Sequence, residues 1–450
     1  MKLRVKVCLF SALFVALGQV AADHSSLDGT STIRGLVRLK QKPKSYRFDP
    51  DYDPFDHINP DIDNEPIVKK FNYPVEKHKI TTEDGYRLLA YRIPGHKVNP
   101  SKEKRTPVLL IPGAFCISTQ WIVRGPGIDL AYLLADEGYD VWMSNNRGTG
   151  LARAHVSLDP DYDAEYWNFS WHEMGVYDHP ANIDYILNAT GKEAVIYIGH
   201  SMGTTSSYVL LSTRPEYNDK VALAISLAPV AYWYQPLHPI VNALKPLVTR
   251  IQTMFDKLQI YEIFPNQAGM QSLTESMCKS RNVRFRNLCL LAITNVIDGP
   301  DIEQLPDLDT LIRFTSFMPA GMAKKSMSHY GQNMINNGDF RMYDYGEAEN
   351  VVRYGAKIPP KYALKNIKTP IALVFSFGDV YNTPEVIPLK KFKFEKIVNN
   401  VYYLAKDIPN LETVEAVPDH KFTHLDFIFA KDVKTLLNDR LMQMMAKYST

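Results

Sequence analysis

The sequence predicts an α/β protein with a mostly parallel central sheet, helices on both faces of the sheet, and an inserted, mainly helical segment. Two features of the chain support this fold class. Short apolar runs alternate with segments of helical period, as in sheets whose strands are buried on both faces. Between residues 232 and 365 the alternation stops, and apolar residues recur at the spacing of amphipathic helices.

The first expected strands form a hairpin. Residues 78–82 and 86–92 flank Asp84-Gly85, a dipeptide that is typical of tight hairpin turns. Apolar runs that we expect to be buried strands follow at residues 108–111, 140–143, 195–198, 221–227 and 371–375. The expected core of the protein therefore comprises residues 65–231 and 366–450.

The segment 232–365 interrupts this core between two of its expected strands. From Leu244 to Leu258, apolar side chains recur three and four positions apart, which places them on one face of a helix. Strand and helix patterns do not alternate here. We therefore predict a mainly helical cap or lid that is inserted into the core.

The first 22 residues have the features of a signal peptide. Three basic residues precede an apolar stretch, which ends at the small residues Val20-Ala21-Ala22. A membrane anchor is the alternative, but the stretch is short for the ~20 residues that span a bilayer. We expect cleavage after Ala22, no transmembrane segment in the mature chain, and a secreted or lysosomal protein. Residues 23–64 are polar and contain an acidic, proline-containing run, which predicts an extended N-terminal arm.

Cysteine and asparagine positions agree with the secretory route. After the signal peptide the chain has Cys116, Cys278 and Cys289, and the last two are near enough in sequence to close a short disulfide loop. The alternative is two unpaired thiols. The sequons at Asn168 and Asn188 are candidate glycosylation sites, and we favour Asn188 because Asn168 lies among aromatic residues.

The charge composition argues against nucleic acid as a partner. The chain has 51 basic and 49 acidic residues and a net charge of +2. Nucleic-acid binding requires a clustered basic face, which this composition does not indicate.

The strongest chemical signal is the pattern G-x-S-x-G at residues 199–203. It directly follows the apolar run 195–198 and precedes a segment that can form a helix, residues 204–211. This strand–turn–helix context is typical of the nucleophile elbow of the α/β-hydrolase fold. We predict that Ser201 is the nucleophile on a strained turn, and we interpret His200 as a packing residue.

A serine hydroxyl needs a base within hydrogen-bond distance, and that base needs an orienting acid. In this fold the chain order is serine, acid, histidine. Asp379 follows the expected strand 371–375 and is the candidate acid. His420 and His424 both follow the last expected strand, and their positions alone do not decide between them.

The oxyanion of an acyl-transfer reaction needs two backbone N–H donors. The residue after the nucleophile, Met202, supplies one. The loop after the strand 108–111 reads Pro112-Gly113-Ala114, and we expect the second donor to be the Ala114 N–H. This chemistry uses neither a metal ion nor an organic cofactor.

Several segments together resemble the acid lipase family of gastric and lysosomal lipases and their insect relatives. They are the Thr82–Tyr86 hairpin, Asn145-Asn146-Arg147-Gly148, Phe169-Ser170-Trp171-His172-Glu173-Met174 with Tyr177-Asp178, Tyr343-Asp344-Tyr345-Gly346, and His424-Leu425-Asp426-Phe427. The resemblance implies a serine lipase that hydrolyses triacylglycerols or sterol esters at a lipid–water interface, under a mobile lid.

The resemblance also assigns individual residues. It selects His424 over His420 as the catalytic base, supports Asp379 as the acid, and makes Asp426 structural. Cys278 and Cys289 fall near the family's disulfide in the cap.

The chain departs from the family at two positions of the site. Pro112-Gly113-Ala114 stands where the family usually has His-Gly-Leu, and Met202 replaces a frequent glutamine. Because the oxyanion donors are backbone groups, we expect these changes to affect substrate preference more than activity. The alternatives are a carboxylesterase or thioesterase for smaller acyl substrates, or a non-catalytic lipid-binding homologue, which would typically lack the nucleophile or the base. The oligomeric state is not indicated.

Overall fold

The computed structural model describes most of the expected core and part of the segment inserted in it. The described residues are 39–40, 42–43, 46, 48–49, 53–60, 62–95, 105–234, 242, 245–265, 270–284, 303–381, 385–387, 396–398 and 400–449. The predicted signal peptide, residues 1–22, lies outside them, as does much of the predicted arm before residue 53.

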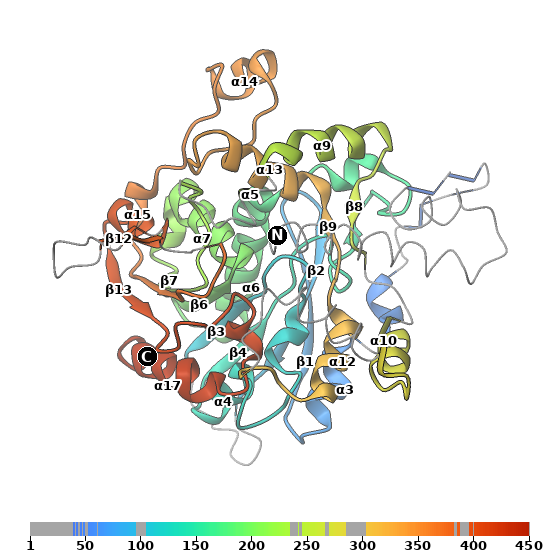
Figure 1. The fold of residues 1–450 in the computed structure, drawn as a ribbon, viewed down its shortest axis with the longest axis vertical. Helices are drawn as coiled ribbons and strands as arrows, with labels where there is room; N and C mark the ends of the chain where they lie inside the picture. Colours follow the sequence, from blue (N-terminus) through green and yellow to red (C-terminus); the bar gives the residue numbers. More distant parts are fainter. Residues whose placement is uncertain are drawn as a thin grey trace.

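A nine-stranded sheet runs through the centre of the molecule (Figure 1). Its strands are β1 (Glu76–Thr81), β2 (Tyr86–Ile93), β3 (Pro107–Ile111), β4 (Asp140–Met143), β5 (Ala154–His155), β6 (Val195–His200), β7 (Val221–Leu227), β10 (Ile371–Phe375) and β13 (Leu411–Ala416). They are ordered β1-β2-β4-β3-β6-β7-β10-β13, with β5 beside β2. From β4 to β13 each strand is parallel to the next, whereas β2 pairs antiparallel with β1, β4 and β5.

Each face of the sheet is covered by its own helices. Leu110 and Ile198 pack in one apolar cluster with residues of α4 (Leu130–Asp136) and α17 (Asp439–Met445). Leu109 and Tyr197 pack in the other cluster, with residues of α6 (His179–Thr190), α7 (Met202–Thr213) and α15 (Asn400–Asp407). Successive strand residues point to opposite faces, so a sheet that is covered twice needs strands that are apolar throughout.

The predicted α/β-hydrolase fold is confirmed, and the expected hairpin and buried strands are all present in it. Two strands of the sheet, β5 and β13, were not indicated by any apolar run, and β5 has only two residues. β13 lies at the edge of the sheet, where most of its residues are only partly buried, and Glu412 and Glu415 interrupt its apolar residues. An edge strand needs less apolar surface because only one of its sides meets another strand.

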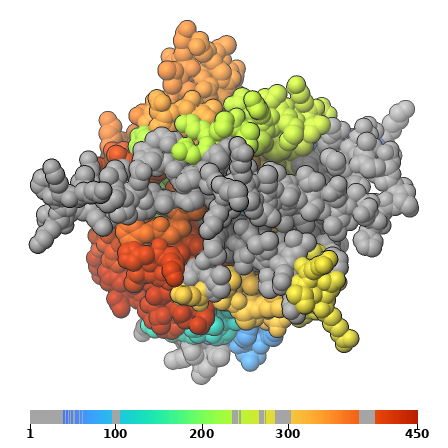
Figure 2. All heavy atoms as spheres, in the orientation of Figure 1, coloured from blue at the N-terminus to red at the C-terminus, as the bar shows by residue number. Residues whose placement is uncertain are grey.

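Residues 232–365, where they are described, are mainly helical. They form α9 (Val248–Lys257), α10 (Met270–Cys278), α12 (Leu308–Phe317), α13 (Lys324–Ile335) and α14 (Glu347–Tyr354), with the two-residue strands β8 (Glu262–Ile263) and β9 (Met322–Ala323). α9 crosses the upper part of the molecule beside α13, and α14 projects from the surface (Figures 1 and 2).

The shorter elements are α3 (Asn64–Lys69), α5 (Trp171–Glu173), α16 (Asp426–Phe429) and the antiparallel pair β11 (Glu385–Ile387) and β12 (Lys396–Val398). Among the described helices, none combines the length and the apolarity that are needed to cross a bilayer.

Candidate active site

Ser201 occupies the sharp turn between β6 and α7. Its φ of 53° and ψ of −114° lie in a region where the backbone of any residue other than glycine is strained. The glycines on either side leave room for this turn. A Cβ on Gly199 would lie 2.7 Å from the Gly203 carbonyl, and a Cβ on Gly203 would lie 2.7 Å from the Ile111 carbonyl oxygen. Glycine at both positions therefore lets β6, α7 and β3 approach one another.

His424 and Asp379 form a hydrogen-bonded chain with Ser201. The Nε2 atom of His424 is 2.7 Å from Ser201 Oγ, and its Nδ1 donates to Asp379 Oδ2 at 2.8 Å. Asp379 also accepts a hydrogen bond from the Tyr381 backbone N–H at 2.9 Å. Asp379 is fully buried and His424 is nearly so. This arrangement has the connectivity of a nucleophile, a general base and an orienting acid.

The two candidate histidines lie in the loop after β13 and have different surroundings. His420 is exposed and its ring stacks on Phe377 at 5.0 Å, whereas His424 reaches Ser201. Asp426, two residues further on, accepts the Thr423 N–H at 2.6 Å at the start of α16. Asp426 thus shapes the loop that presents His424, and it does not touch the serine.

His200 packs below the histidine loop. It is buried, and its Nε2 donates to the His424 carbonyl oxygen at 3.0 Å. Burial, together with the neighbouring His424, lowers the pKa of His200 to about 3. His200 is therefore neutral at physiological pH and supports the loop as an uncharged hydrogen-bond donor.

The two expected oxyanion donors lie on segments that meet at Ser201. The Met202 N–H is in the first turn of α7, where backbone amides have no partner within the helix. The loop that contains Ala114 passes beside the serine, since a Cβ on Gly113 would lie 3.2 Å from Ser201 Cβ. A residue with a side chain at position 113 would also meet His200 Nδ1 at 2.9 Å.

The Asn145-Asn146 pair anchors this loop, a role that the sequence did not indicate. The Asn146 amide donates to the Pro112 carbonyl at 3.1 Å. The Asn145 side chain accepts the Ser118 N–H at 2.8 Å and donates to the Leu89 carbonyl at 2.8 Å. The turn after β4 thereby connects the loop 112–114 to β2.

Arg147, next to this pair, is a buried cation with two carboxylate partners. It is 1 % exposed and donates to Asp84 in the hairpin at 2.6 and 2.9 Å and to Asp178 at 2.7 Å. Its guanidinium also lies 3.9 Å from the centre of the Tyr86 ring. Burial alone would lower the pKa of Arg147, but Asp178 and Asp84 raise it. Burial raises the pKa of Asp178 to about 6 despite the arginine.

The segment 169–174 connects the core to α13. Trp171 stacks on His329 of α13 with ring centres 3.6 Å apart. Ser170 and Glu173 form a capping box at the start of α5. One residue along α13, the Tyr330 hydroxyl lies 2.8 Å from Thr205 Oγ1, in the helix that Ser201 begins. α13 therefore contacts α7, the helix that follows Ser201, through this hydrogen bond.

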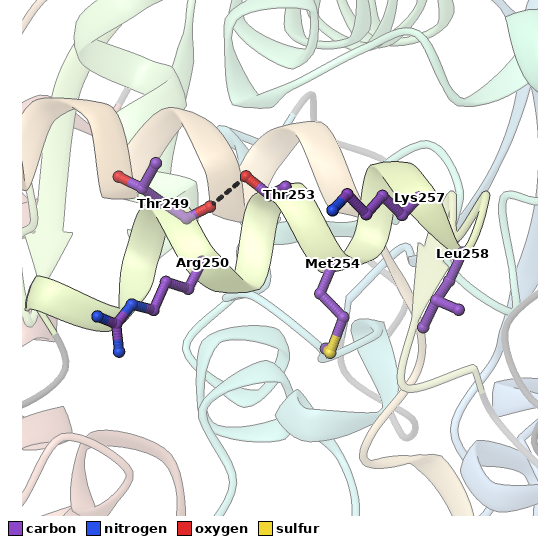
Figure 3. A pocket seen from close by; sticks show the side chains of 6 residues that line it. All are labelled: Thr249, Arg250, Thr253, Met254, Lys257 and Leu258. Carbon is purple, nitrogen blue, oxygen red and sulfur yellow. Dashed lines mark hydrogen bonds between the residues drawn. The ribbon is translucent and has the colours of Figure 1, made fainter.

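A shallow hollow of about 410 Å³ lies along the outer side of α9. Its lining residues, all labelled in Figure 3, are Thr249, Arg250, Thr253, Met254, Lys257 and Leu258. None of them belongs to the serine–histidine–aspartate chain. Met254 is 47 % exposed, so the hollow presents an apolar side chain between two basic ones.

The cysteines and sequons are only partly described. Cys278 is disulfide-bonded, and its predicted partner Cys289 lies outside the described residues. Cys116 is buried as a free thiol, and burial raises its pKa to about 12. Asn168 and Asn188 are both exposed; Asn168 accepts a hydrogen bond from Lys325 at 2.9 Å.

Comparison with known proteins agrees with the observed fold. A family model described as "alpha/beta hydrolase fold" matches residues 106–272, and one described as "Partial alpha/beta-hydrolase lipase region" matches residues 65–125. Lipase 3 of Drosophila melanogaster is 36% identical over 381 residues, which cover 85% of this chain and 92% of the relative. Gastric triacylglycerol lipase of Bos taurus is 32% identical over 397 residues, covering 85% of this chain and 90% of the relative. Lipase member K of Mus musculus is 32% identical over 384 residues, covering 84% of this chain and 89% of the relative.

Proposed function

The chain belongs to the acid lipase family of α/β-hydrolases, and on that basis we propose that it hydrolyses lipid esters through an acyl-enzyme on Ser201. That it is a lipid ester hydrolase follows from the family. The proposal concerns the residues that carry the reaction. The observation that supports it most directly is the hydrogen-bonded chain from Ser201 through His424 to Asp379.

In the proposed reaction His424 takes the Ser201 proton as the serine oxygen attacks the ester carbonyl carbon. Asp379 holds the imidazole with Nδ1 protonated and stabilises the imidazolium that forms. The tetrahedral oxyanion accepts hydrogen bonds from the Met202 and Ala114 N–H groups. His424 then protonates the leaving alcohol as the ester C–O bond breaks. Water, deprotonated by His424, attacks the acyl-enzyme and releases the fatty acid and the free serine.

The proposed substrates are triacylglycerols, sterol esters or both, presented at a lipid–water interface. The Bos taurus relative is named a gastric triacylglycerol lipase, which favours the first class. We assign residues 65–231 and 366–450 to the catalytic core and 232–365 to a cap. Within the cap, the exposed Met254 on α9 and the partly exposed Leu258 directly after it are suited to contact lipid.

The proposed location is the secretory pathway, with a secreted or lysosomal mature protein. The signal-peptide pattern of residues 1–22 and the disulfide at Cys278 support it, because disulfides persist in oxidising compartments. Asn188 and Asn168 are the proposed glycan acceptors. Both are exposed, as an acceptor must be.

The test is an activity profile of the wild type and Ser201→Ala. Substrates are p-nitrophenyl esters from acetate to palmitate, emulsified triolein and cholesteryl oleate, each at acid and neutral pH. We expect long-chain and emulsion activity that disappears in the variant, together with loss of labelling by a fluorophosphonate probe. Exposed Ser157→Ala is the control and should retain both. Activity that survives in Ser201→Ala would refute the proposed nucleophile, and activity on short soluble esters alone would favour a carboxylesterase.

A further inference from the structure

The imidazole of His424 contacts two aromatic rings, one of which is buried and one exposed. The His200 ring has its centre 5.1 Å away and is 1 % exposed, whereas the Tyr381 ring has its centre 4.7 Å away and is 38 % exposed. His424 itself is only 6 % exposed. Of these two rings beside His424, Tyr381 is therefore the one that is exposed to solvent.

Tyr381 is held in place from two directions. Its backbone N–H donates to Asp379 Oδ1 at 2.9 Å. Its ring meets the Trp233 ring edge-on, with centres 6.1 Å apart, and Trp233 in turn meets Tyr330 of α13 at 6.0 Å. We call Tyr381, Trp233 and Tyr330 the aromatic wall. Trp233 is buried and Tyr330 packs against it as a partly buried ring, so Tyr381 is the most exposed ring of the wall.

We propose that Tyr381 is a specificity-determining residue that selects the leaving alcohol of the ester. This rests on the proposed function, in which His424 protonates that alcohol. The alcohol oxygen must then lie within hydrogen-bond distance of His424 Nε2. The carbon chain attached to that oxygen has to pass the rings around the imidazole. Since His200 is buried, Tyr381 is the ring that this chain meets.

The chemistry of the ring defines the preferred alcohol. A phenol side chain presents a rigid, largely apolar surface, and it favours flat or bulky hydrocarbon groups over small ones. We therefore expect Tyr381 to favour esters whose alcohol carries a ring or a branched chain next to the hydroxyl. The acyl chain is attached on the other side of the reacting carbonyl, so its selection should not depend on Tyr381.

The experiment compares two series of soluble esters in Tyr381→Ala, Tyr381→Leu and Tyr381→Phe. The first series fixes the butanoyl group and varies the alcohol from methyl to isobutyl to benzyl. The second fixes p-nitrophenol and varies the acyl group from acetyl to octanoyl. Tyr402→Ala is the matched control, because Tyr402 is also 38 % exposed and packs on one aromatic ring, Phe375.

In Tyr381→Ala the ratio of kcat/KM for benzyl over methyl butanoate should fall about tenfold, in line with the loss of one aromatic contact. Tyr381→Phe should keep the wild-type ratio. Tyr381→Leu keeps part of the apolar volume but lacks the ring, and its ratio should fall between those of Tyr381→Ala and Tyr381→Phe. The acyl-chain ratios should stay unchanged in all three variants, and Tyr402→Ala should change neither series.

Two results would overturn the inference: a benzyl-to-methyl ratio that stays within about twofold of wild type in both Tyr381→Ala and Tyr381→Leu, or an equal shift in the acyl series. Thermal unfolding shows whether each variant is folded, and if Tyr381→Ala is not, the result for Tyr381→Leu decides whether Tyr381 selects the alcohol.

Ser201→Ala distinguishes failure of this inference from failure of the proposed function. If it remains active, the proposed nucleophile is wrong; if it is inactive while the alcohol ratio is flat, only the role of Tyr381 is wrong.

Discussion

Ser201 holds a backbone conformation that few residues with side chains adopt, and its neighbours keep it there. The turn is compressed between β6 and α7, so the two flanking positions have no space for a Cβ. Strain of this kind costs about 1–3 kcal/mol and persists where the surrounding structure enforces it. The strained turn places Ser201 Oγ 2.7 Å from Nε2 of His424.

The lack of space for a Cβ at Gly203 predicts the effect of replacing this glycine with alanine. Gly203→Ala should destabilise the fold by about 1–3 kcal/mol, because the new Cβ meets the rigid backbone of β3. It should also reduce esterase activity by moving the Met202 N–H. Chemical denaturation and p-nitrophenyl butanoate turnover measure both effects. Gly355→Ala is the control, since a Cβ there meets nothing within 4 Å and only its φ of 69° is unfavourable.

The two histidines of the last loop give a paired prediction. His424→Ala should lower kcat for soluble esters by about 10⁴-fold or more, because the serine loses its base. His420→Ala removes an exposed ring four residues earlier and should leave kcat nearly unchanged. The opposite pattern, or a large loss in both variants with intact folding, would show that the wrong histidine has been assigned.

At the scale of elements, turns far from one another in sequence are joined by buried polar side chains. The Arg147 guanidinium donates hydrogen bonds to Asp84 in the β1–β2 hairpin and to Asp178 at the start of α6. Asn146, beside it, fixes the loop of the expected oxyanion donor. These contacts explain what the polar motifs of the sequence do, since a buried charge is tolerated only when it is paired and hydrogen-bonded.

Arg147→Met should therefore be strongly destabilising, and the effect should depend on pH. Loss of the cation leaves Asp178 buried without a charged partner, which costs about 3–5 kcal/mol. The pKa of Asp178 is already raised to about 6, and it would rise further in the variant. A carboxyl with a raised folded-state pKa takes up a proton in the native state, so the stability of the variant is retained at low pH and lost as pH rises.

Urea denaturation at pH 5 and pH 8 measures this effect. The difference between wild type and Arg147→Met should be larger at pH 8. Arg353→Met removes an exposed arginine that pairs with Glu349 on α14, and it should cost less than about 0.5 kcal/mol at either pH. An equal loss at both pH values would mean that the damage comes from packing and not from the unpaired carboxylate.

At the scale of the whole molecule, the sheet brings together residues that are far apart in the chain. Ser201 and His424 are separated by 223 positions and Asp379 and His424 by 45, yet each pair is hydrogen-bonded. α13 contacts α7 through the hydrogen bond between Tyr330 and Thr205, and α9 contacts α13 through Gln252, which donates to the Ser328 carbonyl at 3.1 Å. A change on the outer side of α9 is thus two helices away from the serine.

This arrangement predicts separate effects on emulsified and soluble substrates. Met254→Glu should reduce activity on emulsified triolein about tenfold, because it removes an apolar contact and adds a charge that lipid excludes. Activity on soluble p-nitrophenyl butanoate should not change. Gln259→Glu adds the same charge outside the α9 hollow and should affect neither. Equal losses on both substrates would argue for damage to the site and against a lipid-contacting α9.

The sequence alone determined the fold class, the positions of most buried strands along the chain and the position of the serine turn. These depend on local patterns: apolar runs, helical spacing, and glycines around one serine. The strand β13 was not predicted from the sequence, because an edge strand needs no continuous apolar run. Only the tertiary structure decided three other features: the carboxylate partners of Arg147, the hydrogen bond from Asn146 to the Pro112 carbonyl, and the position of Tyr381 beside His424. They are contacts between side chains distant in sequence, and they exist only after the sheet has set strand order and register.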